Sequence, residues 1–191
     1  MTFRHRIFVS FSLLLLGALI LAYLVMSKVM YQEITGQAYT SGLRYLKHID
    51  WLINQELKIT DPERLQQVLT EIGQRLNLRV TYVAASGRVL ADSGVHKEAV
   101  AAMENHAQRP EIKEAMQAGT GRSTRYSSTL QTSFLYVALG IEPINGPRPA
   151  VLRVAMPTAQ LQSALNGIKG QLALFLAVLL LLAGLLSWLI S

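Results

Sequence analysis

The run Leu172–Ile190, LALFLAVLLLLAGLLSWLI, decides how the rest of the chain can be arranged. It has no charged residue and no proline over 19 residues, close to the ~20 that an α-helix needs to cross a bilayer. A buried core helix is the alternative, but such helices are rarely apolar on every side for five turns. The run therefore predicts a transmembrane helix over residues 171–190.

A second apolar run, Ile7–Met26, follows the basic residues Arg4 and Arg6. A cleaved signal peptide also begins basic and then apolar, but its apolar core has only ~7–15 residues and a small-x-small site follows it. This run is 20 residues long without such a site directly after it, so an uncleaved transmembrane helix is predicted. Because positive residues stay in the cytoplasm, we expect a two-pass inner-membrane protein. Residues 1–6 would be cytoplasmic and residues 27–170 extracytoplasmic.

The 144 residues from 27 to 170 are enough for one domain with its own core. The whole chain carries 18 Lys and Arg against 12 Asp and Glu, a net charge of +6, and no cysteine. The lack of cysteine excludes disulfides and thiolate metal sites. The excess of basic residues after Ala115 favours a small acidic ligand or membrane lipid as a partner, although a solvated basic surface would look the same. Nucleic acid is not an expected partner of a domain outside the membrane.

The segment from Ser27 to about Ile59 lacks proline and predicts a helix that continues the first transmembrane helix. Its apolar residues recur in steps of three and four, which marks one helical face. These residues are Leu46, Ile49, Ile53 and Leu57. Such a face packs on its own domain or on a second copy of the chain. We expect both, with a parallel homodimer formed through this face and through the transmembrane helices.

The next residues predict an α+β domain. Thr60–Glu63 supplies the capping residue, proline and acid that begin a helix, which continues to about Asn77. Turn residues and β-branched residues then predict five strands, separated by short helices at about residues 98–107 and 110–119. The strands are expected at residues 78–84, 88–92, 122–128, 134–141 and 150–156, with turns around Leu130 and at 143–149 and a final helix from Pro157. The strand at 134–141 is apolar on both faces and should be central.

Several short runs resemble one family of membrane receptors. They are Gly87–Ser93 (GRVLADS), Met103–Ile112 (MENHAQRPEI), Gly119–Ser127 (GTGRSTRYS), Leu135–Ala138 (LYVA) and Val151–Val154 (VLRV). In these runs the chain resembles the membrane sensor half of a sensor histidine kinase of the phosphate-regulon (PhoR) type. The resemblance implies a PAS-like five-stranded antiparallel sheet whose long N- and C-terminal helices continue into the two transmembrane helices. It also implies a dimeric sensor that ends before a HAMP linker and a kinase core.

Three residues are candidates for binding an acidic ligand: Arg125, Arg153 and Tyr136. Guanidinium groups suit carboxylate and phosphate, whereas the alternative is that the arginines are charges that protect a sheet edge. Strand alternation places Arg122 on the opposite face from Arg125, so the three arginines are not expected to line one pocket.

A second group is expected to form a structural polar network that ties the short helices to the sheet. Its members are Asp92, His106, Arg109 and Glu111, with Arg109 paired to an acid. A metal site built from Asp92, His96, Glu104 and His106 is an alternative, but their spacing matches no closed zinc pattern. No metal and no cofactor is therefore expected.

The leading functional hypothesis is the sensor module of a two-component histidine kinase, without catalytic activity of its own. The chain has neither a Gly-x-Ser-x-Gly nucleophile turn in its middle segment nor a phosphate-binding loop. The alternatives are the sensor half of a chemoreceptor or of a cyclic-nucleotide enzyme, and a membrane anchor or assembly protein that binds no ligand.

Overall fold

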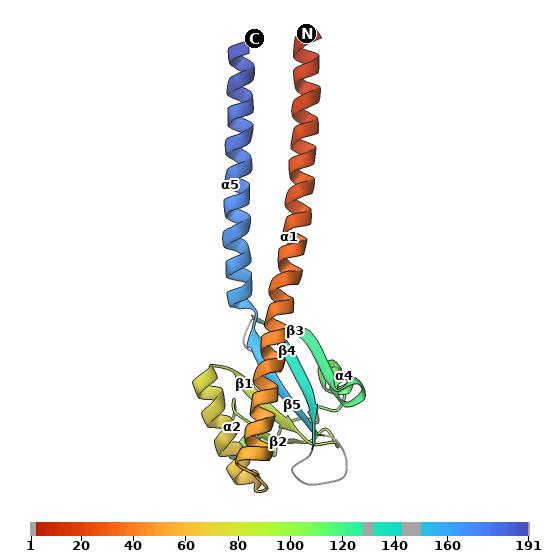
Figure 1. Cartoon of the computed structure of the whole chain (residues 1–191), viewed down its shortest axis with the longest axis vertical. Coiled ribbons are helices and arrows are strands. Elements are labelled where there is room, and N and C mark those ends of the chain that lie inside the picture. Colours follow the sequence, from red (N-terminus) through yellow and green to blue (C-terminus); the bar gives the residue numbers. More distant parts are fainter. Residues whose placement is uncertain (1–2, 128–131, 143–149, 191) are drawn as a thin grey trace. The chain divides into compact units, whose positions relative to one another are not determined.

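The structure, a computed structural model, describes residues 3–127, 132–142 and 150–190. The chain divides into two compact units: Met1–Gly36 with Gln160–Ser191, which we call the helical unit, and Gln37–Ala159, the sheet unit. The elements in Figure 1 are α1 (Phe3–Trp51), a π-helical turn (Leu52–Glu56), α2 (Pro62–Leu76), β1 (Arg79–Val83), β2 (Val89–Asp92), α3 (Lys97–Val100), α4 (Pro110–Ala118), β3 (Thr120–Ser127), β4 (Thr132–Ile141), β5 (Ala150–Pro157) and α5 (Ala159–Ile190).

The five strands form one antiparallel sheet in the order β2-β1-β5-β4-β3. The predicted α+β class and the five-stranded antiparallel sheet are therefore confirmed. β5 is the middle strand, and seven of its eight residues are buried. β4, which the sequence predicts to be central, lies inside the sheet between β5 and β3.

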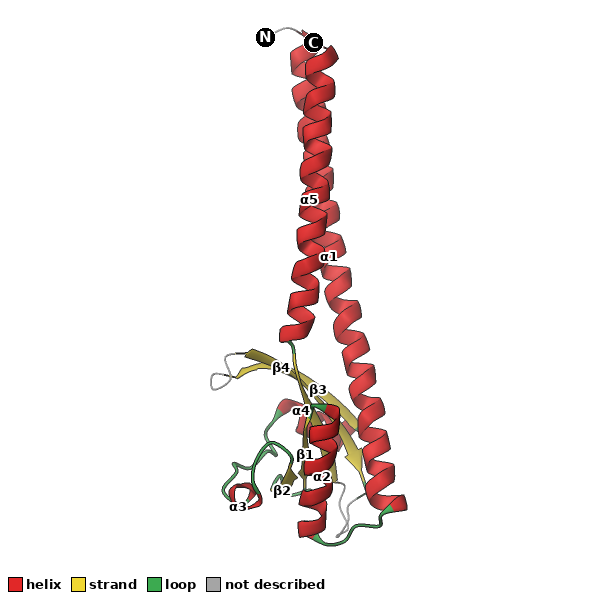
Figure 2. Ribbon diagram, turned by 90° about the vertical axis from the view of Figure 1, so that its left-hand side faces the viewer, coloured by secondary structure: helices red, strands yellow, loops and turns green. Residues whose placement is uncertain are grey.

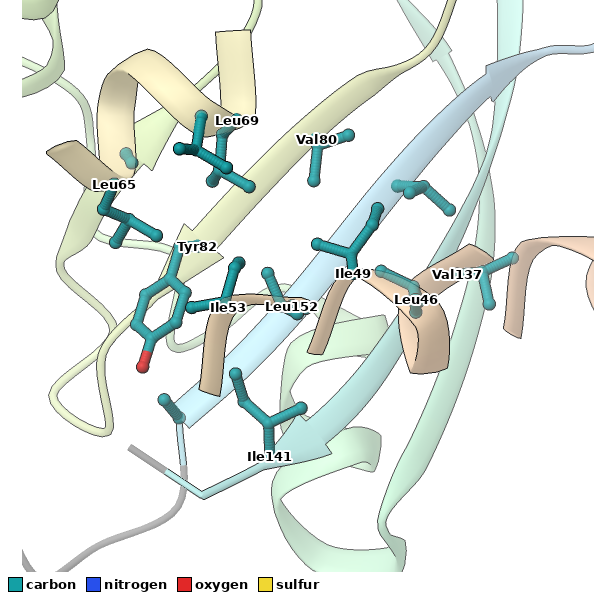
Figure 3. Packing of buried hydrophobic residues seen from close by; sticks show 14 of the residues in the cluster. Leu46, Ile49, Ile53, Leu65, Leu69, Val80, Tyr82, Val137, Ile141 and Leu152 are labelled. Atoms are coloured by element: carbon teal, nitrogen blue, oxygen red, sulfur yellow. The ribbon is translucent and has the colours of Figure 1, made fainter. Parts of the chain in front are cut away.

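One face of the sheet carries the main hydrophobic core. The end of α1 and the whole of α2 cover this face, as Figures 1 and 2 show. Leu46 and Ile49 of α1 and Ile53 of the π-helical turn after it pack there against strand residues such as Tyr82 and Leu152 (Figure 3). Burial of an aliphatic side chain of this size contributes about 1.5–3 kcal/mol, so this short stretch of α1 is a main source of stability.

This packing corrects the predicted dimer face. Leu46, Ile49 and Ile53 are 0–2% exposed within a single chain, so they cannot also contact a second copy. Of the four predicted residues only Leu57 is exposed. A 3/4 apolar stripe looks the same whether it packs on a sheet or on another helix, and here the sheet uses it. The homodimer itself stays a prediction.

α1 is one continuous helix from Phe3 to Trp51, as predicted for the first apolar run and the segment after it. By length and composition it is the one helix among the described residues that could cross a membrane. The described apolar part of α5, Asn166–Leu182, is shorter than such a span. The second transmembrane helix therefore stays a prediction.

α2 and the first two strands begin and end close to where the sequence predicts. The Asp61 carboxylate caps α2 by accepting from the backbone N–H groups of Glu63 and Arg64, at 3.3 and 3.1 Å. Asn77 ends the helix in the left-handed conformation. The predicted turn around Leu130 and the predicted loop at residues 143–149 lie outside the described residues.

α4 covers the other face of the sheet, over a smaller apolar cluster that includes Ile112 and Ala115. The close packing of α4 on the sheet depends on Gly121 of β3, because a Cβ at that position would lie 2.1 Å from the carbonyl oxygen of Glu111. Only a glycine lets the backbones of α4 and β3 approach this closely. The first turn of α4 is therefore held directly against the sheet.

Gly42 and Gly36 of α1 form a matched pair that tests how closely α1 packs on the sheet. A Cβ at Gly42 would lie 2.9 Å from Met156 Cε and 3.0 Å from Val137 Cγ2, whereas nothing lies within 4 Å of one at Gly36. Each change to alanine gains ~1 kcal/mol of helix propensity, but overpacking costs about 1–3 kcal/mol. In denaturant titrations of the full chain, we expect the free energy of unfolding of Gly42→Ala to be about 1–2 kcal/mol lower than that of Gly36→Ala. Equal stability of the two variants would show that α1 does not approach the sheet this closely.

Candidate functional site

A group of polar side chains lies inside the sheet unit, on the face of the sheet that α4 covers. Strand residues alternate between the two faces, and the register decides which of them are neighbours. Arg153 of β5 lies opposite Thr81 of β1 and Ala138 of β4. Tyr136, two residues before Ala138, is on the same face, and Arg125 is on the adjacent strand β3. We call this group the polar cluster: Thr81, Asp92, Glu111, Arg125, Tyr136 and Arg153.

The carboxylate of Glu111 is the centre of the polar cluster. Glu111 lies in the first turn of α4 and is fully buried. Its Oε1 accepts from Arg125 Nη2 at 2.7 Å and from Arg153 Nη1 at 3.3 Å. Arg153 is buried as well, whereas the side chain of Arg125 is 26% exposed. Two guanidinium groups from different strands therefore share one carboxylate oxygen from a helix.

The ring of Tyr136 supports both guanidinium groups. The Arg125 Cζ atom lies 4.3 Å from the ring centroid, and the Arg153 Cζ atom lies 5.1 Å from it. Each cation–π contact of this kind contributes about 0.5–2 kcal/mol, with the larger value for desolvated groups. The ring therefore positions the two positive charges side by side.

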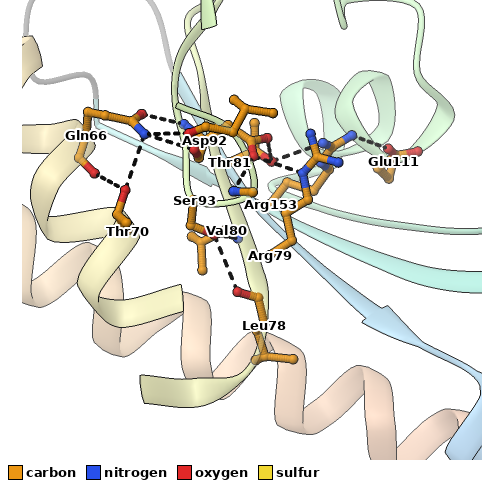
Figure 4. Close-up of polar contacts among 12 residues, drawn as sticks. Gln66, Thr70, Leu78, Arg79, Val80, Thr81, Asp92, Ser93, Glu111 and Arg153 are labelled. Carbon is orange, nitrogen blue, oxygen red and sulfur yellow. Dashed lines mark hydrogen bonds and ion pairs between the residues drawn. The ribbon is translucent and has the colours of Figure 1, made fainter. Parts of the chain in front are cut away.

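The cluster continues from Arg153 through Thr81 to Asp92, as Figure 4 shows. Arg153 Nη2 donates to Thr81 Oγ1 at 3.0 Å, and the Thr81 hydroxyl donates to Asp92 Oδ2 at 2.8 Å. Asp92 Oδ1 accepts from Arg79 Nε and from the backbone N–H of Gly94, both at 2.8 Å. An unbroken chain of hydrogen bonds thus runs from α4 through β5 and β1 to β2.

α2 joins the same network through Gln66. Its Oε1 accepts from the backbone N–H of Asp92 at 2.9 Å, and its Nε2 donates to the Asp92 carbonyl at 3.0 Å. The sequence interpretation missed Gln66, Thr81 and Arg79. The signal for Thr81 was present, because it is a hydroxyl in the middle of an apolar strand, where it needs a buried partner.

The predicted ligand residues Arg125, Arg153 and Tyr136 do lie together in the structure. Both arginines already bind Glu111, and Arg153 is on the middle strand, away from any sheet edge. Arg122 is on the opposite face, where its Cζ lies 5.2 Å from the ring centroid of Tyr39. The expectation that the three arginines do not line one pocket is therefore correct.

The residues of the predicted structural network lie in different places. Asp92 and Glu111 belong to the polar cluster and are connected through Thr81 and Arg153. Arg109 pairs with an acid, Glu104, at 3.1 Å near the surface. His106 is buried, and its backbone N–H donates to the carbonyl of Gly87 at 2.8 Å. The charges of Arg153 and Asp92 in the cluster act in opposite directions on the pKa of its imidazole.

Four buried side-chain atoms have no hydrogen-bond partner within the described part of the chain. They are His106 Nδ1, Glu111 Oε2, Arg125 Nε and Arg153 Nε. Three of them belong to the same two ion pairs. Buried polar atoms are nearly always paired, so the polar cluster has unused hydrogen-bonding capacity where its charges are concentrated.

Burial, together with the nearby charges of Arg153 and Arg109, lowers the pKa of the His106 imidazole to about 4. His106 is therefore neutral at neutral pH. Burial also lowers the pKa of the Arg153 guanidinium below its ordinary value, while the carboxylate of Glu111 acts in the opposite direction. Arginine still keeps its proton at any physiological pH, so the Arg153–Glu111 contact is an ion pair.

The other candidate sites are a metal site and two surface hollows. Among the residues that the structure describes, no three His, Asp or Glu side chains are close enough to hold a metal ion, Asp92, His96, Glu104 and His106 included. Two surface hollows of about 450 Å³ lie along α2 near β2 and α3. Glu63 and Lys97 line both hollows and bind each other.

No protein-family model matches the chain, and no curated protein matches its sequence. Among solved structures, it is similar to the sensor domain of the Vibrio cholerae histidine kinase DctB, with a TM-score of 0.52 and 15% identity over 72% of this chain and 57% of that one. It is also similar to the ligand-binding domain of the Campylobacter jejuni chemoreceptor Tlp3. The complex with L-valine has a TM-score of 0.51 and 16% identity over 75% of this chain and 60% of that one. The complex with 4-methylisoleucine has a TM-score of 0.50 and 15% identity, with coverages of 74% and 58%.

These similarities establish the fold. A five-stranded antiparallel sheet with a long N-terminal helix matches the fold of PAS- and Cache-like sensor domains, so the predicted PAS-like fold is confirmed. The chain spans less than two thirds of the length of each of these domains.

The importance of the ion pairs for stability can be measured with Arg153→Met. The change leaves Glu111 buried with one of its two arginines, and removing a partner from a buried ion pair costs about 3–5 kcal/mol. We expect a loss of this size in the free energy of unfolding of the full chain. The control is Arg75→Met, which breaks the exposed pair with Glu71 and should change stability by less than about 0.5 kcal/mol. Similar losses in both variants would contradict this account.

The stability of the sheet unit should fall in acid because of His106. Its pKa is about 4 in the folded chain and ~6.5 when unfolded, so the unfolded state binds the proton more readily between these values. Stability is complete above pH ~6.5 and falls by about 2–3 kcal/mol as the pH drops to ~4. His106→Gln should remove this part of the pH dependence in thermal unfolding experiments, whereas His96→Gln, at an exposed position, should keep it. An unchanged pH profile in His106→Gln would exclude His106 as its source.

Proposed function

We propose that this chain is the sensing part of a membrane signalling protein: a two-pass, dimeric module whose domain, residues 27–170, lies outside the bacterial inner membrane. One observation carries the proposal. The sheet unit has the fold of sensor domains from a histidine kinase and a chemoreceptor, and its core helix α1 is also the helix that is apolar enough to cross a membrane. On this basis the chain detects a stimulus and has no catalytic activity of its own.

The covalent connections of the sheet unit suit such a role. Leu46 and Ile49 hold the end of α1 in the core, so a rearrangement of the sheet must move the helix or repack it. The middle strand β5 leads to α5 through Thr158, whose backbone N–H and hydroxyl both donate to the carbonyl of Ser133 at 2.8 Å. Arg153 of β5 lies five residues before Thr158, the residue that links β5 to α5. A stimulus that switches such a module from 1:99 to 99:1 has to supply ~5.5 kcal/mol of differential binding.

The finer proposal is a histidine kinase as the parent protein. It is supported by the resemblance of Gly87–Ser93 and Met103–Ile112 to PhoR-type sensors and by the similarity to the DctB sensor domain in fold. The similarity to Tlp3 favours a chemoreceptor to the same degree, because one sensor fold serves several outputs. A cyclic-nucleotide enzyme and an anchor protein without a ligand are the remaining alternatives.

The dimer of this proposal uses surfaces that are free in a single chain. α1 exposes Tyr45 and Trp51 within a single chain. The ring of Trp51 stacks on His48, with 5.9 Å between the ring centroids. Together with the transmembrane helices, this side replaces the predicted Leu46–Leu57 face as the proposed contact between copies.

A chimera tests the sensing role directly. Residues 1–190 are joined to the cytoplasmic half of a histidine kinase from which its own sensor has been removed. If the polar cluster controls the signalling state, Arg153→Met and Arg125→Gln should each change autophosphorylation in membranes several-fold relative to the unmodified chimera. The exposed change Arg75→Met should not, since it touches neither the cluster nor the core.

The orientation of the chimera is checked with cysteine labelling, which is straightforward because the chain has no cysteine. Gln117→Cys, at an exposed position of α4, should react with a membrane-impermeant maleimide added to cells with a permeabilised outer membrane. Labelling only after cell lysis would overturn the extracytoplasmic assignment. Identical autophosphorylation in all inserted variants would overturn the sensing role.

A further inference from the structure

The hydrogen bonding between the Glu111 carboxylate and the two arginines of the polar cluster is incomplete. Only its Oε1 binds them, and its buried Oε2 has no partner within the described residues. The Nε atoms of Arg125 and Arg153 are also unpaired in that part of the chain. Guanidinium groups bind carboxylates best through two parallel hydrogen bonds. Glu111 does not reach this geometry with either arginine, whereas a free carboxylate is not fixed to a helix backbone and can adopt it.

The charges around Glu111 favour an added anion. The network contains the cations Arg79, Arg125 and Arg153 and the anions Asp92 and Glu111, which leaves one positive charge. Buried His106 is neutral at neutral pH and adds none. When Glu111 leaves the two guanidinium groups, the excess rises to two positive charges in a largely desolvated place. Such a site attracts an anion strongly, because charges interact more strongly away from water.

Access to the site is through Arg125. Its side chain is 26% exposed on edge strand β3, whereas that of Arg153 beneath it is only 5% exposed. The ring of Tyr136 contacts both guanidinium groups, so it keeps them side by side without help from Glu111. A small anion can therefore meet Arg125 first and then reach Arg153.

Glu111 also helps to hold α4 on the sheet, so a change in its contacts would affect the fold. It is the second residue of α4, directly after Pro110, and its backbone carbonyl lies against Gly121 of β3. Its side chain is thus one of the attachments of α4 to β3 and β5. Replacing the Glu111 carboxylate by a free one removes this attachment while the arginines stay neutralised.

We propose that Arg125 and Arg153, supported by Tyr136, form a binding site for a small carboxylate anion, and that Glu111 is a built-in competitor which occupies the site in the ligand-free chain. The ligand is a carboxylate because the group that it replaces is one. The ligand class deepens the proposed function, and the signalling meaning of the site rests on that function. The binding itself is measured separately.

Propionate is the test ligand, since it reproduces the Glu111 side chain beyond the Cα atom. The full chain in detergent or nanodiscs is titrated with sodium propionate at constant ionic strength, with sodium chloride as the exchanged salt, and the thermal unfolding midpoint is recorded. The midpoint of the wild type should rise above that in chloride. In Glu111→Ala the half-saturating concentration should be at least about tenfold lower, which corresponds to a competitor that occupies the site about 90% of the time.

Three variants make the result specific. Glu111→Gln keeps the volume of the side chain and should show the same increase in affinity if Glu111→Ala does not fold. Arg125→Gln should abolish the response to propionate in both backgrounds. Glu104→Ala removes the acid of the exposed Arg109 pair and should respond as the wild type does.

The outcomes separate this inference from the proposed function. A wild-type response no larger than that in chloride, or equal affinity of wild type and folded Glu111 variants, would overturn the competitor role. A response to inorganic phosphate that exceeds the response to propionate would overturn the carboxylate assignment. Propionate binding with the predicted order of affinities supports the inference even if the chimera shows no change in autophosphorylation, because the titration does not depend on signalling.

Discussion

The shared carboxylate of Glu111 is the constraint on which the sheet unit depends. A charge buried without a partner costs several kcal/mol, so α4 can lie on the sheet only where Arg125 and Arg153 meet its first turn. The two arginines come from β3 and β5, which are not adjacent strands, and β4 between them supplies Tyr136. The position of α4 and the register of these three strands are thus fixed together.

The two faces of the sheet have different tasks. The face under α1 and α2 is apolar and gives the unit its stability through residues such as Leu46 and Ile53. The face under α4 combines a small apolar cluster with buried charges. Arg153 has apolar neighbours on both sides along β5, Leu152 and Val154, whose side chains belong to the opposite, apolar face. Strand alternation therefore lets one buried strand join the stable core to the polar cluster.

Much of this arrangement is visible in the sequence, but only where the signal is local. The helix start at Thr60–Glu63, the helix end near Asn77 and the alternation that separates Arg122 from Arg125 depend on neighbouring residues, and the structure agrees with all of them. The joint use of Glu111 by Arg125 and Arg153 depends on strand order and on where α4 lies, and neither has a local signature. The predicted dimer face was wrong for a related reason. The apolar stripe is a local signal, but whether it packs on the sheet of its own chain or on a second copy is not.

A purely structural role is a weak explanation for the polar cluster. Buried ion pairs are often no more stabilising than well-packed apolar residues of the same volume, so stability alone does not require Arg153 and Glu111. A network kept for structural specificity would also be expected to satisfy its members, as Gln66 and the backbone of Asp92 do through two reciprocal hydrogen bonds. At Glu111 the carboxylate and both guanidinium groups instead retain unpaired buried atoms within the described residues. Incomplete pairing makes the Glu111 contact easier to replace than the Asp92 contact, as a site that exchanges an internal anion for an external one requires.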